Sequence, residues 1–247
     1  MSVSVIIPCY NEEQYVGKLL EDVTKQIEPP EAVFVVDCHS KDKTIEVAKG
    51  FSKRLPLTIL MAPYRSAASA RNTGADAAKS DYLLFLDADM RIRPDFVGRL
   101  EKKAVSKRVD VVTPRLKTEG QHPVDTLFVW NLNLWVYFYR LLLRRPFTGT
   151  AGGAMLISNK AHHTMGGYNP KLREFDDNDY IRRMWKHNIS GAFVWRAAAT
   201  TSNRRLVEQG RLATFLQNIP EDYFITRHII RPAMKKLGIK PKWHDLD

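Results

Sequence analysis

The sequence contains 247 residues, of which 44% are hydrophobic and 26% are charged, with 13 glycines and 13 prolines. These values are ordinary for a folded globular protein, and they exclude a disordered chain, a collagen and a simple coiled coil. The formal net charge of +11 at pH 7 indicates an acidic partner, such as a nucleic acid, an anionic membrane surface or a phosphate-bearing small molecule. Charge alone does not distinguish between these partners.

The two cysteines, Cys9 and Cys38, are too few for a disulfide framework in a chain of this length, so we expect a reducing compartment. The N-terminal run MSVSVIIPCYNEE lacks the basic region of a signal peptide. The longest uncharged apolar stretch, 126–139, is shorter than the ~20 residues of a membrane-spanning helix. The sequence therefore predicts a cytoplasmic protein without a spanning helix.

The first half of the chain alternates between strand and helix patterns. Short apolar, β-branched runs predict strands that are buried on both faces, and amphipathic or alanine-rich runs between them predict helices. In chain order we expect strand 3–8, helix 12–26, strand 32–36, helix 44–51, strand 57–61, helix 66–79 and strand 82–86. This alternation predicts an α/β fold with an open parallel sheet, in which ligands bind at the carboxyl ends of the strands.

The pattern is looser after residue 110. The expected elements are a strand near 109–114, an aromatic helix over 124–143, a helix over 177–187 and a strand over 191–195. A basic tail follows from Thr226 onward. We interpret the chain as one domain with a basic C-terminal extension.

Two carboxylates, Asp87 and Asp89, directly follow the apolar strand 82–86. Like charges at the end of a buried strand repel each other, and a divalent cation such as Mg²⁺ or Mn²⁺ with a phosphate ligand relieves this repulsion. The alternative is a solvated turn with two surface aspartates.

A second acidic group, formed by Asp176, Asp177 and Asp179, opens the helix expected over 177–187. The helix macrodipole favours acids at this end, so the three residues can be capping residues. A carboxylate here can instead act as a general base, provided that it lies within hydrogen-bond reach of a substrate hydroxyl.

Other motifs argue against several enzyme classes. The glycine-rich segment TGTAGGAMLIS lets the backbone approach a ligand closely, but it does not match a phosphate-binding P-loop. No G-x-G-x-x-G follows the first strand, no G-x-S-x-G is present, and the 7 histidines lack zinc-site spacing. ATPase, dinucleotide dehydrogenase, triad hydrolase and zinc protease interpretations therefore lose their main support.

Four stretches resemble glycosyltransferase family 2, the inverting nucleotide-sugar enzymes with a GT-A fold. They follow the family's order over most of residues 2–188: VSVIIPCYNEE, VVDCHSKDKT, SAASARNTGADAAKSDYLLFLDADMRIRPDF and GTAGGAMLISNKAHHTMGGYNPKLREFDDNDYIRRMWKHN. The resemblance implies a Rossmann-like, mostly parallel sheet flanked by helices, with a small acceptor-side subregion. We expect a single domain at 1–225, with a donor half at 1–115 and an acceptor half at 116–205, and a helical basic extension at 226–247.

The resemblance also implies roles for individual residues. Asp87 would lie near the donor ribose, Asp89 would bind Mg²⁺ or Mn²⁺, and Asp177 would be the general base. The other implied residues are Pro8, Tyr10, Asn11, Glu12, Asp37 and Arg71 on the donor side, and Gly152, Gly153 and Asp176 on the acceptor side. The metal would offset charge on the leaving nucleoside diphosphate while the base takes the acceptor's proton, and one displacement would invert the anomeric centre.

The sequence departs from the family pattern at two places. Asp37 is followed by Cys38, where many members have a second aspartate, which leaves the donor's base open between a UDP and a GDP sugar. Many members also place a metal-binding histidine after the last core strand, where this chain has TTSNRRLVEQGRL. Arg204 and Arg205 could meet the pyrophosphate there, and the alternative is a solvated helix face.

The expected acceptor is a hydroxyl of a saccharide or of a lipid-linked molecule. The aromatic segment FVWNLNLWVYFYRLLLRRPF is either a core helix or an interfacial helix at a membrane surface. The basic tail at 227–242 favours contact with an anionic membrane, which would make the protein peripheral at the inner face of the cell membrane.

Three alternatives to a metal-dependent inverting transferase stay open. They are a retaining glycosyltransferase on the same fold, a catalytically silent nucleotide-binding module, and a basic nucleic-acid-binding protein. The last leaves the Asp87–Asp89 pair unexplained, and the basic residues lack an aromatic-interleaved recognition element. We therefore expect no nucleic acid partner.

Overall fold

The structure is a computed structural model that describes residues 1–119, 153–172 and 176–204. The chain separates into two compact units, the first formed by Met1–Lys117 with Asn131–Thr201 and the second by Thr118–Trp130 with Ser202–Asp247. Of the second unit, only 118–119 and 202–204 are among the described residues. The expected domain boundaries at 115, 205 and 225 stay predictions, and the helix expected over 124–143 and the basic tail lie outside the described residues.

The first half of the chain forms the parallel part of a mixed sheet. Its strands are β1 (Val3–Cys9), β2 (Ala32–Asp37), β3 (Leu57–Met61) and β4 (Tyr82–Leu86), which pair in parallel in the order β3-β2-β1-β4. The helices between them are α1 (Val16–Thr24), α2 (Thr44–Lys49) and α3 (Ala67–Ala77). The predicted α/β alternation is therefore confirmed. Strand β3 is an edge strand, and its Met61 is 55% exposed.

Helix α1 begins four residues later than expected, at Val16 instead of residue 12. The reason lies in the preceding loop, where three successive backbone amides are held by the β2–α2 loop. The amides of Asn11, Glu12 and Glu13 donate to Ser40, Thr44 and Asp42 at 2.9, 2.7 and 3.1 Å. Asn11 has a φ of 53°, so the chain cannot enter a regular helix at this point. The loops after β1 and β2 are thus bonded to each other.

The second half of the chain extends the sheet in mixed directions. Its strands are β5 (Met90–Ile92), β6 (Val111–Thr118), β7 (Ala154–Ser158) and β8 (Gly191–Thr201), and the full order is β3-β2-β1-β4-β7-β6-β8-β5. The pairs β4–β7, β6–β7 and β5–β8 are antiparallel. The helices of this half are α4 (Phe96–Lys107), α6 (Asn159–Thr164) and α7 (Asp176–Lys186). The sheet is therefore parallel in its first half and mixed in its second.

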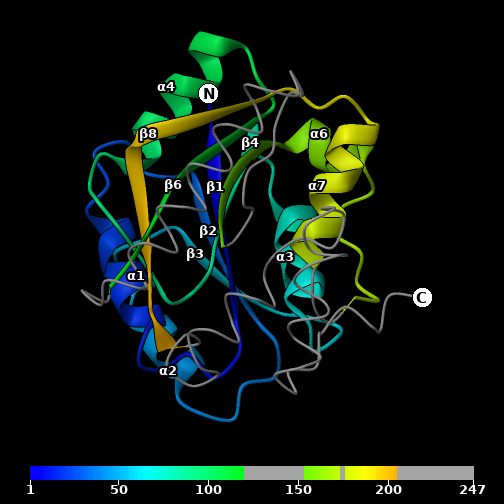
Figure 1. Ribbon diagram of the computed structural model, residues 1–247. Helices are drawn as coiled ribbons and strands as arrows, with labels where there is room; N and C mark the ends of the chain where they lie inside the picture. The colour runs from blue at the N-terminus through cyan, green and yellow to red at the C-terminus, as the bar shows by residue number, and fades with distance from the viewer. Residues whose placement is uncertain (120–152, 173–175, 205–247) are drawn as a thin grey trace, which may run out of the picture. The chain divides into compact units, whose positions relative to one another are not determined.

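Helices cover the sheet in two layers. Helices α3, α6 and α7 lie together on one face, and α1 and α2 lie on the other (Figure 1). Side chains alternate between the faces, so that Ile6, Phe34 and Phe85 belong to the core cluster under α3, α6 and α7. Among the described residues, no helix is long and apolar enough to cross a lipid bilayer.

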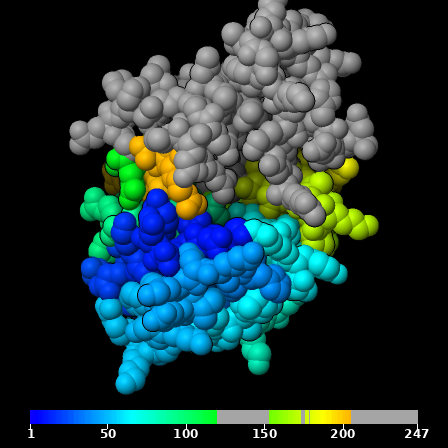
Figure 2. Space-filling model, turned by 90° about the horizontal axis from the view of Figure 1, so that it is seen from below, coloured from blue at the N-terminus to red at the C-terminus, as the bar shows by residue number. Residues whose placement is uncertain are grey.

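The carboxyl ends of β1, β2 and β4 meet at one edge of the sheet. Figure 2 looks onto this edge, with the segment after β1 in dark blue near its centre and the last strand in orange above it. Beyond β4, Arg91, whose side chain is 44% exposed, donates to the buried Asp22 of α1 at 2.6 and 2.8 Å. Because β1, β2 and β4 are parallel neighbours, the residues that follow them lie at the same end of the sheet.

Gly74 sets how closely α3 packs on the sheet. A Cβ at this position would lie 2.5 Å from Ile6 Cγ2 and 3.2 Å from Val36 Cγ2. Glycine to alanine inside a helix usually stabilises a protein by about 0.4–1 kcal/mol. Here we expect Gly74→Ala to lower the free energy of unfolding by about 1–3 kcal/mol, because overpacking displaces buried strands. Urea unfolding measures the change, and Lys79→Ala, at an exposed position, is the control. A Gly74→Ala variant that is more stable than the wild type would contradict this packing of α3 on the sheet.

Candidate functional site

The centre of the candidate site is an ion cluster around Arg71. Arg71 lies in the first half of α3 and is 4% exposed. Its Nη2 lies 2.9 Å from Oδ1 of Asp87, which follows β4. Its Nη1 lies 2.7 Å from Oδ2 of Asp176 and 3.4 Å from Oδ1 of Asp177, at the start of α7. One guanidinium therefore joins the acid after β4 to the acids that open α7.

The charges of this cluster stabilise the ionised arginine. Burial alone would lower the pKa of the Arg71 guanidinium, but the nearby carboxylates, Asp177 and Asp87 first among them, raise it well above its ordinary value. One positive charge thus faces three carboxylates. This excess of negative charge is suited to a further cation or to hydrogen-bond donors of a ligand.

Gly153, which directly precedes β7, holds Asp87 in place. The amide of Asp87 donates to the carbonyl of Gly153 at 2.7 Å. Gly153 has a φ of 74°, and a Cβ there would lie 2.5 Å from Oδ2 of Asp87. The structure places Gly153 against Asp87, and its expected place on the acceptor side stays a prediction; Gly152 lies outside the described residues.

Asp89 lies where β5 pairs with the end of β8. Its Oδ2 accepts a hydrogen bond from the hydroxyl of Thr201 at 3.5 Å, and Thr201 is paired with Met90 across the two strands. Within the described ranges, no three histidine, cysteine or acidic side chains are grouped closely enough to hold a metal on their own. Carboxylate oxygens are nevertheless the donors that Mg²⁺ and Mn²⁺ prefer, and such ions are commonly completed by substrate phosphates. The donor set therefore fits a metal that is shared with a diphosphate.

Four of the expected donor-side residues lie at the carboxyl ends of β1 and β2 or in the loop after β1. Pro8 is buried in β1, opposite Val36, whereas Asn11 and Glu12 belong to the bonded loop described above. Asp37 is 1% exposed; its Oδ2 accepts from the amide of Ser40 at 3.0 Å. Its Oδ1 is buried and has no hydrogen-bond partner among the described residues. An orphaned carboxylate oxygen is costly, so a donor group from a ligand would be favourable here.

Tyr10 provides an aromatic surface at the same edge. The guanidinium of Arg65, an exposed residue between β3 and α3, lies 4.0 Å from the centre of the Tyr10 ring. A planar cation against an aromatic ring is a surface on which a nucleobase can stack. Tyr10 and Arg65 therefore present flat groups at this end of the sheet on which a planar ring can stack.

The structure does not test the expected roles of Arg204 and Arg205. Arg204 belongs to the second unit, and Arg205 lies outside the described residues. Their expected contact with a pyrophosphate stays a prediction.

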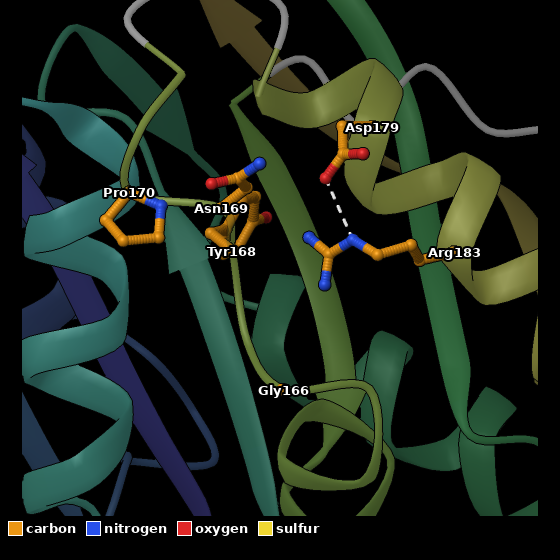
Figure 3. Close-up of a pocket in the computed structure, with 6 residues that line it drawn as sticks. All are labelled: Gly166, Tyr168, Asn169, Pro170, Asp179 and Arg183. Atoms are coloured by element: carbon orange, nitrogen blue, oxygen red, sulfur yellow. Dashed lines mark hydrogen bonds and ion pairs between the residues drawn. The ribbon is translucent and has the colours of Figure 1, made fainter.

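A cavity of about 280 Å³ lies along α7, lined by Gly166, Tyr168, Asn169, Pro170, Asp179 and Arg183 (Figure 3). Arg183 donates through Nε to Asp179 at 2.8 Å and through Nη1 to the carbonyl of Met165 at 3.0 Å. Through these bonds, the charged side chains of the cavity hold α7 against the turn that precedes it. We therefore interpret the cavity as a feature of packing and not as the centre of the site.

Sequence reasoning missed the aromatic residues beneath the cluster, Tyr168 and Tyr180. Both are buried, and Arg71 lies over the Tyr168 ring at 5.1 Å. Tyr168 directly follows Gly166 and Gly167. An aromatic residue directly after two glycines is a signal that could have indicated close packing at this point.

Several curated proteins are similar to this chain in sequence. An uncharacterized glycosyltransferase of Haemophilus influenzae is 37% identical over 185 residues, covering 74% of this chain and 61% of that protein. The chain spans less than half the length of several other curated relatives.

Solved structures share the fold. TarS of S. aureus in complex with UDP matches with a TM-score of 0.70 and 21% identity, over 97% of this chain and 76% of that one. A mannosyltransferase of Pyrobaculum calidifontis in complex with GDP-Man and Mn²⁺ matches with a TM-score of 0.62 and 19% identity, over 87% of this chain and 62% of that one.

The sequence model of the family described as "Glycosyl transferase family 2" matches residues 4–166. This match extends over more than half of the chain, which therefore belongs to glycosyl transferase family 2.

Proposed function

We propose that this chain is a metal-dependent inverting glycosyltransferase that transfers a sugar from a UDP or GDP sugar to a hydroxyl of a saccharide or lipid-linked acceptor. The main support is the bridge that Arg71 makes between Asp87 and Asp177, at 2.9 and 3.4 Å. A single arginine side chain thus contacts both the carboxylate that follows β4 and a carboxylate at the start of α7. Donor binding and acceptor activation need such groups close together.

The donor would bind at the carboxyl edge of the parallel strands. Its base would stack near Tyr10 and Arg65 and donate to the unpartnered Oδ1 of Asp37, and Asp87 would bind the ribose. Support comes from the structural relatives, whose complexes contain UDP, UDP-GlcNAc and GDP-Man. The replacement of a second acid by Cys38 leaves both uracil and guanine as candidates.

Asp89 would hold the divalent metal together with the diphosphate of the donor, and Thr201 would orient the Asp89 carboxylate. When bound, such an ion stabilises negative charge on the leaving nucleoside diphosphate. Mg²⁺ and Mn²⁺ both fit these oxygen donors, and one structural relative is in complex with Mn²⁺.

Asp177 would accept the proton of the acceptor hydroxyl as that oxygen attacks the anomeric carbon. The charge of Arg71 at 3.4 Å favours the ionised carboxylate that this role needs. Attack from the side opposite the leaving group inverts the configuration. A product with the donor's configuration would instead favour the retaining alternative.

The net charge of +11 suits a phosphate-bearing donor and an anionic surface. We therefore keep a lipid-linked acceptor and peripheral contact with the inner face of the cell membrane as part of the proposal.

Asp177→Asn is expected to lower kcat by about 10²–10⁴-fold, because it removes the base, while binding of the donor nucleotide is preserved. Release of nucleotide from UDP-GlcNAc, UDP-glucose and GDP-mannose in the presence of Mn²⁺ measures turnover. Asp179→Asn, two residues further along α7, is the matched control and should retain most activity. Unchanged turnover in Asp177→Asn would remove Asp177 from its role.

Asp89→Asn is expected to abolish the Mn²⁺-dependent part of nucleotide binding, because an amide is a much weaker metal ligand than a carboxylate. Calorimetric titration of UDP and of GDP, with and without Mn²⁺, measures the effect. Asp76→Asn, whose side chain is 72% exposed, is the control. Equal Mn²⁺ dependence in Asp89→Asn and in the control would exclude Asp89 as the ligand.

A further inference from the structure

We propose that Tyr168 is a positioning residue, whose buried ring holds the Arg71 guanidinium where it can bridge the donor-side and base-side carboxylates. The inference rests on the proposed function, because that function gives Asp87 and Asp177 their separate roles. It assigns a role in the reaction to a residue that touches neither the donor nor the acceptor.

Tyr168 is held tightly by the residue next to Arg71. The amide of Tyr168 donates to Oδ1 of Asn72 at 2.7 Å, and the Asn72 amide group donates to the carbonyl of Tyr168 at 2.8 Å. Gly167 permits this approach, since a Cβ there would lie 2.7 Å from Oδ1 of Asn72. Two successive residues of α3 therefore contact Tyr168. The Asn72 side chain bonds to the Tyr168 backbone, and the Arg71 guanidinium lies over the Tyr168 ring.

The other face of the Tyr168 ring is fixed by α7. Tyr180 stacks on Tyr168 with the ring centres 3.9 Å apart and an angle of 10° between the planes. This spacing leaves no room for a guanidinium between the rings, so Arg71, 5.1 Å from the Tyr168 centre, lies outside the pair. The stack thus sets the distance between α3, which bears Arg71, and α7, which bears Asp176 and Asp177.

The far side of the stack is also anchored. The Tyr180 hydroxyl lies 2.6 Å from Nδ1 of His162, and Arg183 lies over the Tyr180 ring at 5.5 Å. Burial lowers the pKa of His162 to about 3, and burial raises the pKa values of both tyrosines. All three rings are therefore neutral over the working pH range, and the charges that face Arg71 are those of Asp87, Asp176 and Asp177.

Loss of the ring would free the Arg71 guanidinium to turn toward one carboxylate at the expense of the others. If the guanidinium turns away from Asp177, this proposed base protonates more readily, so activity would be lost at a higher pH on the acid side. Packing alone predicts a different result, namely lower stability with an unchanged pH profile.

The test compares Tyr168→Phe, which keeps the ring, with Tyr168→Leu, which removes it. Nucleotide release from UDP-GlcNAc, UDP-glucose and GDP-mannose with Mn²⁺ is measured across pH, with thermal midpoints recorded in parallel. Tyr168→Phe should retain wild-type kcat and pH profile. Tyr168→Leu should lose roughly 10- to 100-fold in kcat, since small displacements of reacting groups cost this much, and its acid limb should move to higher pH.

Asn72→Ala is the second variant, for use if Tyr168→Leu does not fold. It removes both backbone bonds to Tyr168 but leaves the ring, and it should shift the acid limb in the same direction by a smaller amount. Wild-type kcat and pH profile in a folded Tyr168→Leu or Asn72→Ala would overturn the inference. A wild-type protein that releases nucleotide from none of the donors would overturn the proposed function itself, and the positioning role with it.

Discussion

The buried guanidinium of Arg71 is the interaction on which the arrangement of the site depends. It is 4% exposed and contacts three carboxylates that come from two other parts of the chain, one of them 105 residues away in sequence. A buried charge is tolerated only when it is paired, and removal of one partner of such a pair typically costs about 3–5 kcal/mol. The end of β4, the start of α7 and the first half of α3 are therefore constrained to meet at one point.

This constraint explains several features around it. Gly153 has no side chain because Asp87 occupies the space where a Cβ would lie. The loops after β1 and β2 are bonded to each other, and the carbonyl of Glu12 also accepts from the amide of Val16 at the start of α1, so this end of the sheet is held from both sides. The Tyr168–Tyr180 stack is neutral, so it packs against the Arg71 guanidinium without adding charge. The three carboxylates therefore keep an excess of negative charge over Arg71. Under the proposed function, this excess of negative charge would serve to bind a metal shared with a diphosphate and to remove the proton of the acceptor.

The parallel half of the fold could be predicted from the sequence because its signals are local. Val3–Cys9, Ala32–Asp37 and Tyr82–Leu86 are mostly apolar runs, and a polar residue stands at the end of each run or directly after it. The antiparallel insertion of β7 beside β4 could not be predicted, because AMLIS has no pattern that specifies strand direction. Helix α4 has its buried residues at Phe96, Val97, Leu100 and Ala104, a helical spacing that the sequence contained and that the predictions overlooked.

The acidic residues of the site could be predicted as separate motifs but not as one cluster. Their common partner, Arg71, lies far from Asp176 in sequence, and no local pattern indicates which carboxylate a buried arginine will contact. Tyr168 was missed for the same reason, since its contacts with Asn72 and Tyr180 exist only in the folded chain.

The thermal unfolding midpoint, measured with UDP, GDP, CDP, dTDP and ADP in the presence and absence of Mn²⁺, tests the central claim most directly. A ligand that binds only the native state raises the midpoint, by an amount that corresponds to about 2.7 kcal/mol at a concentration of 100 times its Kd. The account predicts a rise that depends on Mn²⁺ for at least one of UDP and GDP. No shift with any nucleotide, with or without the metal, would contradict a nucleotide-sugar site at this edge of the sheet.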